Sequence, residues 1–138
     1  MTELELLARL IMCEAGGEGD IGMSAVATVV MNRVNITEGE YGRYNTVRDV
    51  AYAPRQFECV TGNHPTQNIW SMNPEWVHYA IAEWAFNGGR LGMVGNGLWF
   101  FNPYGPECSY NFPSGVGVFM ARLGDHCFYA PTSSYYKT

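Results

Sequence analysis

The sequence predicts an α+β fold, with helices over the first two-thirds of the chain and a small antiparallel sheet in the C-terminal half. Three segments, 4–15, 21–34 and 73–87, place apolar residues at helical spacing. After Gly89 the apolar residues no longer follow helical spacing, and short apolar or aromatic runs alternate with Gly, Pro and Asn. A chain of 138 residues without an internal repeat, a low-complexity segment or a linker fits one domain, residues 1–138.

In the first helical segment, Leu7, Leu10 and Glu14 share one face. Thr2 is placed to cap the N-terminus, because a threonine hydroxyl accepts a hydrogen bond from a free backbone N–H of the first turn. The pair Gly16-Gly17 ends the pattern where a C-terminal cap is expected. We therefore expect the helix to end at Glu14 or Ala15.

Similar signals predict the other elements. The second helix starts after Asp20, and its small residues favour close packing against a neighbour. The third long helix begins at Asn73-Pro74, an N-cap residue followed by proline, and ends at Asn87-Gly88. Loop-forming residues predict loops at 35–45 and 56–65, with a short helix at 46–51 between them. Short apolar or aromatic runs predict strands at 98–101, 116–120 and 126–129.

The composition excludes several classes of protein. Hydrophobic residues make up 47% of the chain and charged residues only 15%, which is typical of a globular protein rather than a disordered one. The net charge is −5, so no basic surface for nucleic acid is expected. No apolar run has the ~20 residues of a membrane span, and the N-terminus shows no signal peptide. The many aromatic residues suit a carbohydrate ligand, whose ring faces stack on aromatic planes.

The four cysteines, Cys13, Cys59, Cys108 and Cys127, form no CxxC pair. A chain of this length can fold without disulfides. We therefore expect buried free thiols, while a disulfide or a zinc site remains open.

Glu14 is the strongest candidate for an acid/base residue. Its carboxyl projects from the apolar face of the first helix, where burial raises the pKa and keeps a carboxyl protonated near neutral pH. Such a group can donate a proton to a glycosidic oxygen. The pattern alone also allows Glu14 to point to solvent. Glu18, four residues later, either completes a pair of carboxylates or anchors the turn by accepting backbone N–H bonds.

Several motifs follow one another along the chain. Segment 7–18 reads LARLIMCEAGGE, and segment 25–34 reads AVATVVMNRV. Further matches are Gln56-Phe57, Asn87-Gly88, the segment WFFNP at 99–103 and the segment LGDHCFY at 123–129. Together they resemble the spore cortex-lytic cell wall hydrolases, the family of SleB and CwlJ type, over nearly the whole chain.

This resemblance implies a lysozyme-like helical core, similar to that of lytic transglycosylases, and places the family's catalytic glutamate at Glu14. It implies cleavage of the muramic acid–N-acetylglucosamine strands of peptidoglycan, with the substrate's own 6-hydroxyl in place of an external nucleophile. Such chemistry requires no metal or organic cofactor. The protein is then expected to act in the spore cortex, spore coat or cell wall, with a spore-coat or wall-targeting protein as a partner.

Further candidate residues lie in or next to the motifs. Amide side chains would hydrogen-bond the sugar, and phenylalanine rings would stack on it or belong to the core. Thr28 and Asn32, on successive turns of the second helix, would orient Glu14 or the N-acetyl group of the sugar, or would form hydrogen bonds between helices. For His126, a buried structural role is the alternative. The residues expected to bind substrate are Glu18, Thr28, Asn32, Gln56, Phe57, Phe101, Asn102 and His126.

Other functions remain open at this stage. A metallohydrolase would use His64, His78 and His126 with Cys59 or Cys127, although no HxxxH or HxxE spacing supports it. A wall-binding module would keep the groove without the chemistry. A hydrolysing N-acetylmuramidase or N-acetylglucosaminidase, or a phage-type lysin, would cut the same strands.

Overall fold

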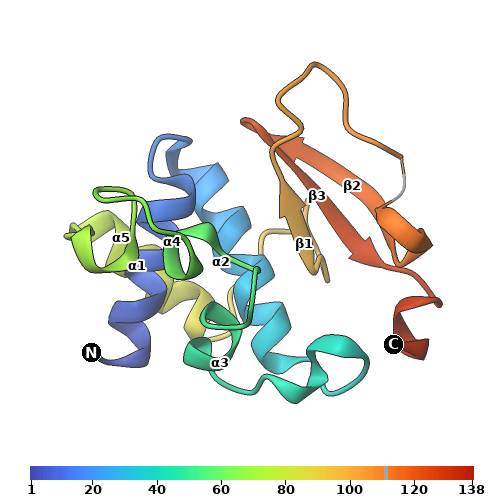
Figure 1. Cartoon of the computed structure of the whole chain (residues 1–138), viewed down its shortest axis with the longest axis horizontal. Helices are drawn as coiled ribbons and strands as arrows, with labels where there is room; N and C mark the ends of the chain where they lie inside the picture. The colour runs from blue at the N-terminus through green and yellow to red at the C-terminus, as the bar shows by residue number, and fades with distance from the viewer. Residues whose placement is uncertain (111) are drawn as a thin grey trace.

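The computed structural model describes residues 1–110 and 112–138 and shows a layer of helices beside a three-stranded antiparallel sheet (Figure 1). The three long helices pack against one another, and the predicted α+β class is confirmed. None of the helices described has the length and apolar character needed to cross a membrane. The helices are α1 (Glu3–Ala15), α2 (Gly19–Asn35), α3 (Val47–Ala51), α4 (Glu58–Thr61) and α5 (Trp76–Phe86), and the strands are β1 (Trp99–Phe101), β2 (Gly117–Leu123) and β3 (His126–Pro131).

The helices α1 and α2 form where the sequence predicts them. The Thr2 hydroxyl accepts a hydrogen bond from the Glu5 N–H at 3.1 Å and caps α1. At the other end, the Gly16 N–H donates to the Met12 carbonyl and closes the last turn. The second helix starts two residues earlier than expected, and Ile21, on its first turn, is exposed. Burial of the apolar faces of both helices stabilises this layer.

Two local predictions are wrong. The helix α5 begins at Trp76 rather than at Pro74, because Nδ1 of His78 accepts the Glu75 N–H at 2.9 Å and caps the helix two residues later. Part of the loop expected at 56–65 forms α4, where the Thr61 hydroxyl donates to the Phe57 carbonyl at 3.0 Å. Apolar periodicity reveals neither of these side-chain bonds.

The expectation of free thiols is also wrong. Cys13 is bonded to Cys59 and Cys108 to Cys127, with Cα atoms 6.3 and 5.9 Å apart. The first disulfide joins the end of α1 to α4, and the second joins the loop after β1 to β3. Partners separated by 46 and 19 residues meet only because the fold brings them together.

In the sheet, the strand β3 lies between β1 and β2. The helices bury an aliphatic core, whereas an aromatic cluster that includes Trp99, Tyr129 and Tyr135 fills the space on the sheet side. The guanidinium of Arg33, near the end of α2, links the two parts, since its Nε donates to the Leu98 carbonyl at 2.6 Å. The candidate site lies where the helical layer meets the sheet.

Candidate active site

Glu14, on the last turn of α1, lines a cavity of about 210 Å³ that also has walls from the sheet. Phe57, Phe100 and Phe101 contribute aromatic surface to this cavity. Burial, together with the nearby charge of Glu58, raises the pKa of Glu14 from 4.5 to about 7. A carboxyl with that pKa exists in both protonation states at neutral pH and can serve as an acid and then as a base.

Glu58 is a second carboxylate whose charge acts on Glu14, and no motif in the sequence indicated it. It directly precedes Cys59, and Glu14 directly follows Cys13, so the disulfide between these cysteines holds the two carboxylates in one neighbourhood. Both glutamates also line a second cavity of about 190 Å³. Glu14 and Glu58 therefore lie together at two neighbouring cavities, which places a second carboxylate within reach of the same ligand.

Glu18 is held in a different set of contacts. Its Oε1 accepts a hydrogen bond from the Asp125 N–H at 3.0 Å, in the turn between β2 and β3. Its Oε2 lies 2.6 Å from Nδ1 of His126, although this close contact lacks the angles of a hydrogen bond. Because these contacts engage both carboxylate oxygens, Glu18 supports the turn and His126, which itself lines the Glu14 cavity.

The structure gathers most of the expected substrate-binding residues around Glu14. Three of them, Glu18, Thr28 and Asn32, do not line its cavity. The Thr28 hydroxyl donates to the Ser24 carbonyl and accepts the Leu91 N–H, and the Asn32 amide donates to the carbonyls of Gly95 and Gly97. Both side chains thus tie α2 to the segment before β1. The expected residues that line the Glu14 cavity are Gln56, Phe57, Phe101, Asn102 and His126.

Tyr104 lines the Glu14 cavity and was not expected there. Its backbone has φ of 51°, a left-handed conformation that non-glycine residues seldom adopt. The Asn102 side chain supports this conformation by accepting the Tyr104 N–H at 2.8 Å. The tyrosine side chain is 91% exposed, so its ring is available to a ligand. The Asn102-Pro103 pair before it is the sequence feature that could have indicated this turn.

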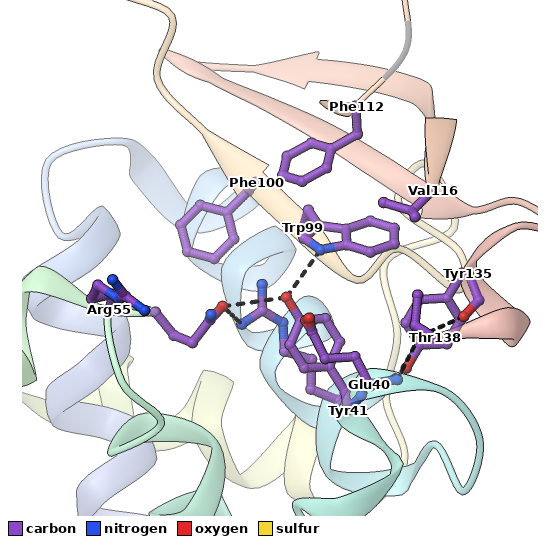
Figure 2. Close-up of a pocket in the computed structure, with 11 residues that line it drawn as sticks. Glu40, Tyr41, Arg55, Trp99, Phe100, Phe112, Val116, Tyr135 and Thr138 are labelled. Carbon is purple, nitrogen blue, oxygen red and sulfur yellow. Dashed lines mark hydrogen bonds between the residues drawn. The ribbon is translucent and has the colours of Figure 1, made fainter. Parts of the chain in front are cut away.

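A larger cavity of about 400 Å³ adjoins the Glu14 cavity, since Arg33, Gln56 and Phe100 line both. Figure 2 shows its aromatic walls, with Trp99 directed at the Tyr41 hydroxyl. The Trp99 Nε1 donates to that hydroxyl at 3.0 Å. Of the residues that line it, only Gln56 was expected to bind substrate, because the other walls come from distant parts of the chain.

The residues considered for a metal site are engaged elsewhere. Cys59 and Cys127 belong to the two disulfides. Nδ1 of His64 accepts backbone N–H groups of its own loop, and Nδ1 of His78 caps α5. Within residues 1–110 and 112–138, no three His, Cys, Asp or Glu side chains gather as metal ligands would.

Comparison with known proteins gives one consistent family. The model of the family described as Cell Wall Hydrolase matches residues 17–129. Cell wall hydrolase CwlJ of Bacillus subtilis (strain 168) is 35% identical over 134 residues, which cover 96% of this chain and 87% of CwlJ. A spore cortex-lytic enzyme of Bacillus cereus is 34% identical over 102 residues, which cover 74% of this chain and 35% of that enzyme.

Solved structures agree with the sequence comparison. The catalytic domain of the germination-specific lytic transglycosylase SleB from Bacillus anthracis has a TM-score of 0.69 and 27% identity, over 92% of this chain and 93% of that domain. The catalytic domain of the Bacillus cereus SleB protein gives the same TM-score with 28% identity. The predicted lysozyme-like, lytic transglycosylase-like core is confirmed by this likeness. The chain therefore belongs to the cell wall hydrolase family.

Proposed function

We propose that this enzyme cleaves the glycan strands of peptidoglycan as a lytic transglycosylase, with Glu14 as its acid/base residue. Membership of the cell wall hydrolase family makes it a peptidoglycan-degrading enzyme. The observation that carries the assignment of Glu14 is its pKa of about 7 in a partly apolar cavity between helices and sheet. An exposed glutamate would be ionised at neutral pH and could not donate its proton.

In the first step, protonated Glu14 donates to the glycosidic oxygen while the bond from that oxygen to the anomeric carbon of muramic acid breaks. The 6-hydroxyl of the same muramic acid attacks this carbon, and the Glu14 carboxylate takes the hydroxyl proton. The new bond closes a 1,6-anhydro ring, and Glu14 is again protonated. No water is consumed, and no external nucleophile is needed because the attacking hydroxyl is part of the substrate.

A hydrolytic reaction is the second candidate function, and the position of Glu58 favours it. This exposed carboxylate lines both cavities that Glu14 lines. It could activate a water molecule or attack the anomeric carbon, as the second carboxylate does in hydrolysing glycosidases. Glu18 is less suited to either role, because its two oxygens already contact the Asp125 N–H and the His126 ring.

Mass spectrometry of fragments released from purified peptidoglycan tests the proposal. We expect 1,6-anhydro-muramic acid ends, lighter than hydrolysed ends by one water molecule. Reduction with borohydride provides a check, since an anhydro end has no free aldehyde. Reducing muramic acid ends that disappear in Glu58→Gln would establish hydrolysis instead. Binding without any release of fragments would indicate a wall-binding module.

The place of action is proposed from the relatives, whose names refer to the cell wall and the spore cortex. We propose that this enzyme acts on spore cortex peptidoglycan during germination. A spore-coat or wall-targeting partner stays a prediction. Digestion of purified cortex beside vegetative peptidoglycan tests the preference, and equal rates on the two would contradict it.

A further inference from the structure

A cavity larger than the Glu14 cavity lies directly beside it (Figure 2). Its volume of about 400 Å³ is within the range of small-molecule sites. Because Arg33, Gln56 and Phe100 line both cavities, a substituent of a sugar bound near Glu14 can extend into the larger one.

The walls of this cavity are held by their own contacts. The Tyr41 hydroxyl accepts from Trp99 Nε1 and donates to Gln56 Oε1 at 3.3 Å. The rings of Trp99 and Phe112 stack with centroids 5.0 Å apart. Tyr135 donates its hydroxyl proton to the Glu38 carbonyl at 2.8 Å. A ligand would therefore meet a preformed apolar wall, which lowers the entropy lost on binding.

Arg33 is the buried cationic group of the cavity, with only 5% of its surface exposed. Its Nε donates to the Leu98 carbonyl, its Nη1 donates to Gln56 Oε1 at 3.0 Å, and its guanidinium lies 4.3 Å from the centre of the Tyr41 ring. Within the part of the chain that the structure describes, Nη2 has no hydrogen-bond partner and no carboxylate forms an ion pair with Arg33. Burial lowers the pKa of Arg33, yet a guanidinium stays charged at neutral pH.

A buried cation without an anionic partner is costly, and an anion that binds to it removes part of the cost. Arg55 adds a second positive charge at the exposed edge of the cavity. Glu40 also lines the cavity, and its charge partly offsets the effect of burial on the pKa of Arg33. This residue is exposed, however, and forms no ion pair with Arg33 in the described residues. The two arginines outnumber the one acidic side chain among the lining residues.

We infer that this cavity is a subsite for a carboxylate-bearing substituent of muramic acid, and that Nη2 of Arg33 binds the carboxylate. The inference rests on the proposed function, which brings a muramic acid to Glu14. Two carboxylates share this chemistry, the one on the lactyl group and the one at the end of an attached peptide. The aromatic wall would contact the methyl and methylene groups of either.

Binding to Glu14→Gln, which holds substrate without cleaving it, tests the subsite. Calorimetry would compare N-acetylmuramic acid, its uncharged methylamide, N-acetylglucosamine and N-acetylmuramoyl-L-alanine. We expect the two carboxylates to bind at least about tenfold more tightly than the methylamide and N-acetylglucosamine. The tighter of the two identifies the source of the carboxylate. Equal affinity for the acid and its methylamide would overturn the inference.

Variants of the cavity complete the test. Arg33→Lys should reduce the preference for the carboxylate, because lysine lacks the planar guanidinium fork. Val116→Trp fills the larger cavity without changing Arg33 or Glu14, so it stays informative if Arg33→Lys fails to fold. Arg55→Gln should weaken carboxylate binding more than Arg122→Gln, a control on β2 that lines neither cavity. Unchanged preference in both Arg33→Lys and Val116→Trp would contradict the inference.

Activity of the unmodified enzyme separates this inference from the proposed function. If the enzyme releases fragments from peptidoglycan but shows no preference for the carboxylate, only the subsite is wrong. If it releases no fragments, the proposed function is wrong.

Discussion

The last turn of α1 and the turn that leads into α2 carry two glutamates, four residues apart, in opposite environments. Glu14 lines a cavity, and burial is the main reason that its pKa rises to about 7. Glu18 accepts a backbone N–H from Asp125 and contacts His126, both from the sheet. The break at Gly16-Gly17 separates the two carboxylates, so the first can serve chemistry while the second holds the helical layer to the sheet.

This difference shows why two carboxylates near each other in sequence need not form a catalytic pair. The partner that affects Glu14 is Glu58, which lies 44 positions further along the chain and comes close through the Cys13–Cys59 disulfide. The following changes test the division of roles, from the largest expected effect to the smallest.

Glu14→Gln should lower the rate of peptidoglycan cleavage by about 10²–10⁴-fold, because glutamine keeps the shape but neither donates nor takes the proton. Fragment release measured by chromatography checks this. A rate close to that of the unmodified enzyme would remove Glu14 from the mechanism.

The same variant has an expected effect on stability that depends on pH. The folded-state pKa of Glu14, about 7, is above its ordinary value of 4.5, so the ionised carboxyl costs stability as pH rises through this window. Above pH 7, Glu14→Gln should be more stable than the unmodified enzyme by on the order of 2–3 kcal/mol, and below pH 4.5 the two should be similar. Urea unfolding at pH 8 and pH 4 measures this difference in the free energy of unfolding. A difference of the same size at both pH values would contradict the burial of Glu14.

Removal of the Cys13–Cys59 disulfide by a double change to serine should lower the free energy of unfolding by about 2–4 kcal/mol. It should also alter the pH dependence of cleavage, since the disulfide holds Glu58 near Glu14. The matched control removes Cys108–Cys127, which closes a shorter loop and joins segments of the sheet side. We expect this control to lose stability with an unchanged pH profile. Identical profiles for both double variants would argue against the link.

Glu18→Gln should cost about 1–2 kcal/mol of stability and reduce cleavage by less than about tenfold, because the amide is a weaker acceptor for the Asp125 N–H and loses the charge next to His126. Thermal unfolding and fragment release, measured on the same preparation, check the two effects. An activity loss as large as that of Glu14→Gln, with unchanged stability, would reverse the two roles.

Glu58→Gln should move the alkaline limb of the pH–rate profile to lower pH, because the negative charge of Glu58 helps to raise the pKa of Glu14. Glu83→Gln, an exposed change on α5, serves as the control. A limb that stays in place in Glu58→Gln, or moves equally in the control, would contradict the coupling of the two carboxylates.

The long elements could be predicted from the sequence because they repeat a pattern over several turns. The apolar face of α1 and its caps at Thr2 and Gly16 are local features, and they also indicate that Glu14 faces inward. The helix α4 could not be predicted, since a single turn depends on the Thr61 hydroxyl bond and on the disulfide at Cys59.

The residues of the candidate site could be predicted only in part from the sequence, for the same reason. Gln56 and Asn102 were expected near Glu14 from the motifs, and they line its cavity. Glu58 lies outside those motifs, and its role depends on contact between distant segments. For Thr28 two roles stayed open, because helical spacing does not say which neighbour a polar side chain meets. Its hydroxyl accepts the Leu91 N–H and so bonds to the segment before β1 instead of orienting Glu14.

The pH dependence of kcat/KM on a soluble peptidoglycan fragment tests most directly whether Glu14 is the proton donor. This parameter reports the pKa values of essential groups in the free enzyme. Because Glu14 must be protonated to donate, and its pKa is about 7, we expect kcat/KM to fall as pH rises through about 7. A profile that falls near pH 4.5 instead, or that stays flat between pH 5 and pH 9, would contradict the assignment of Glu14 as the buried acid.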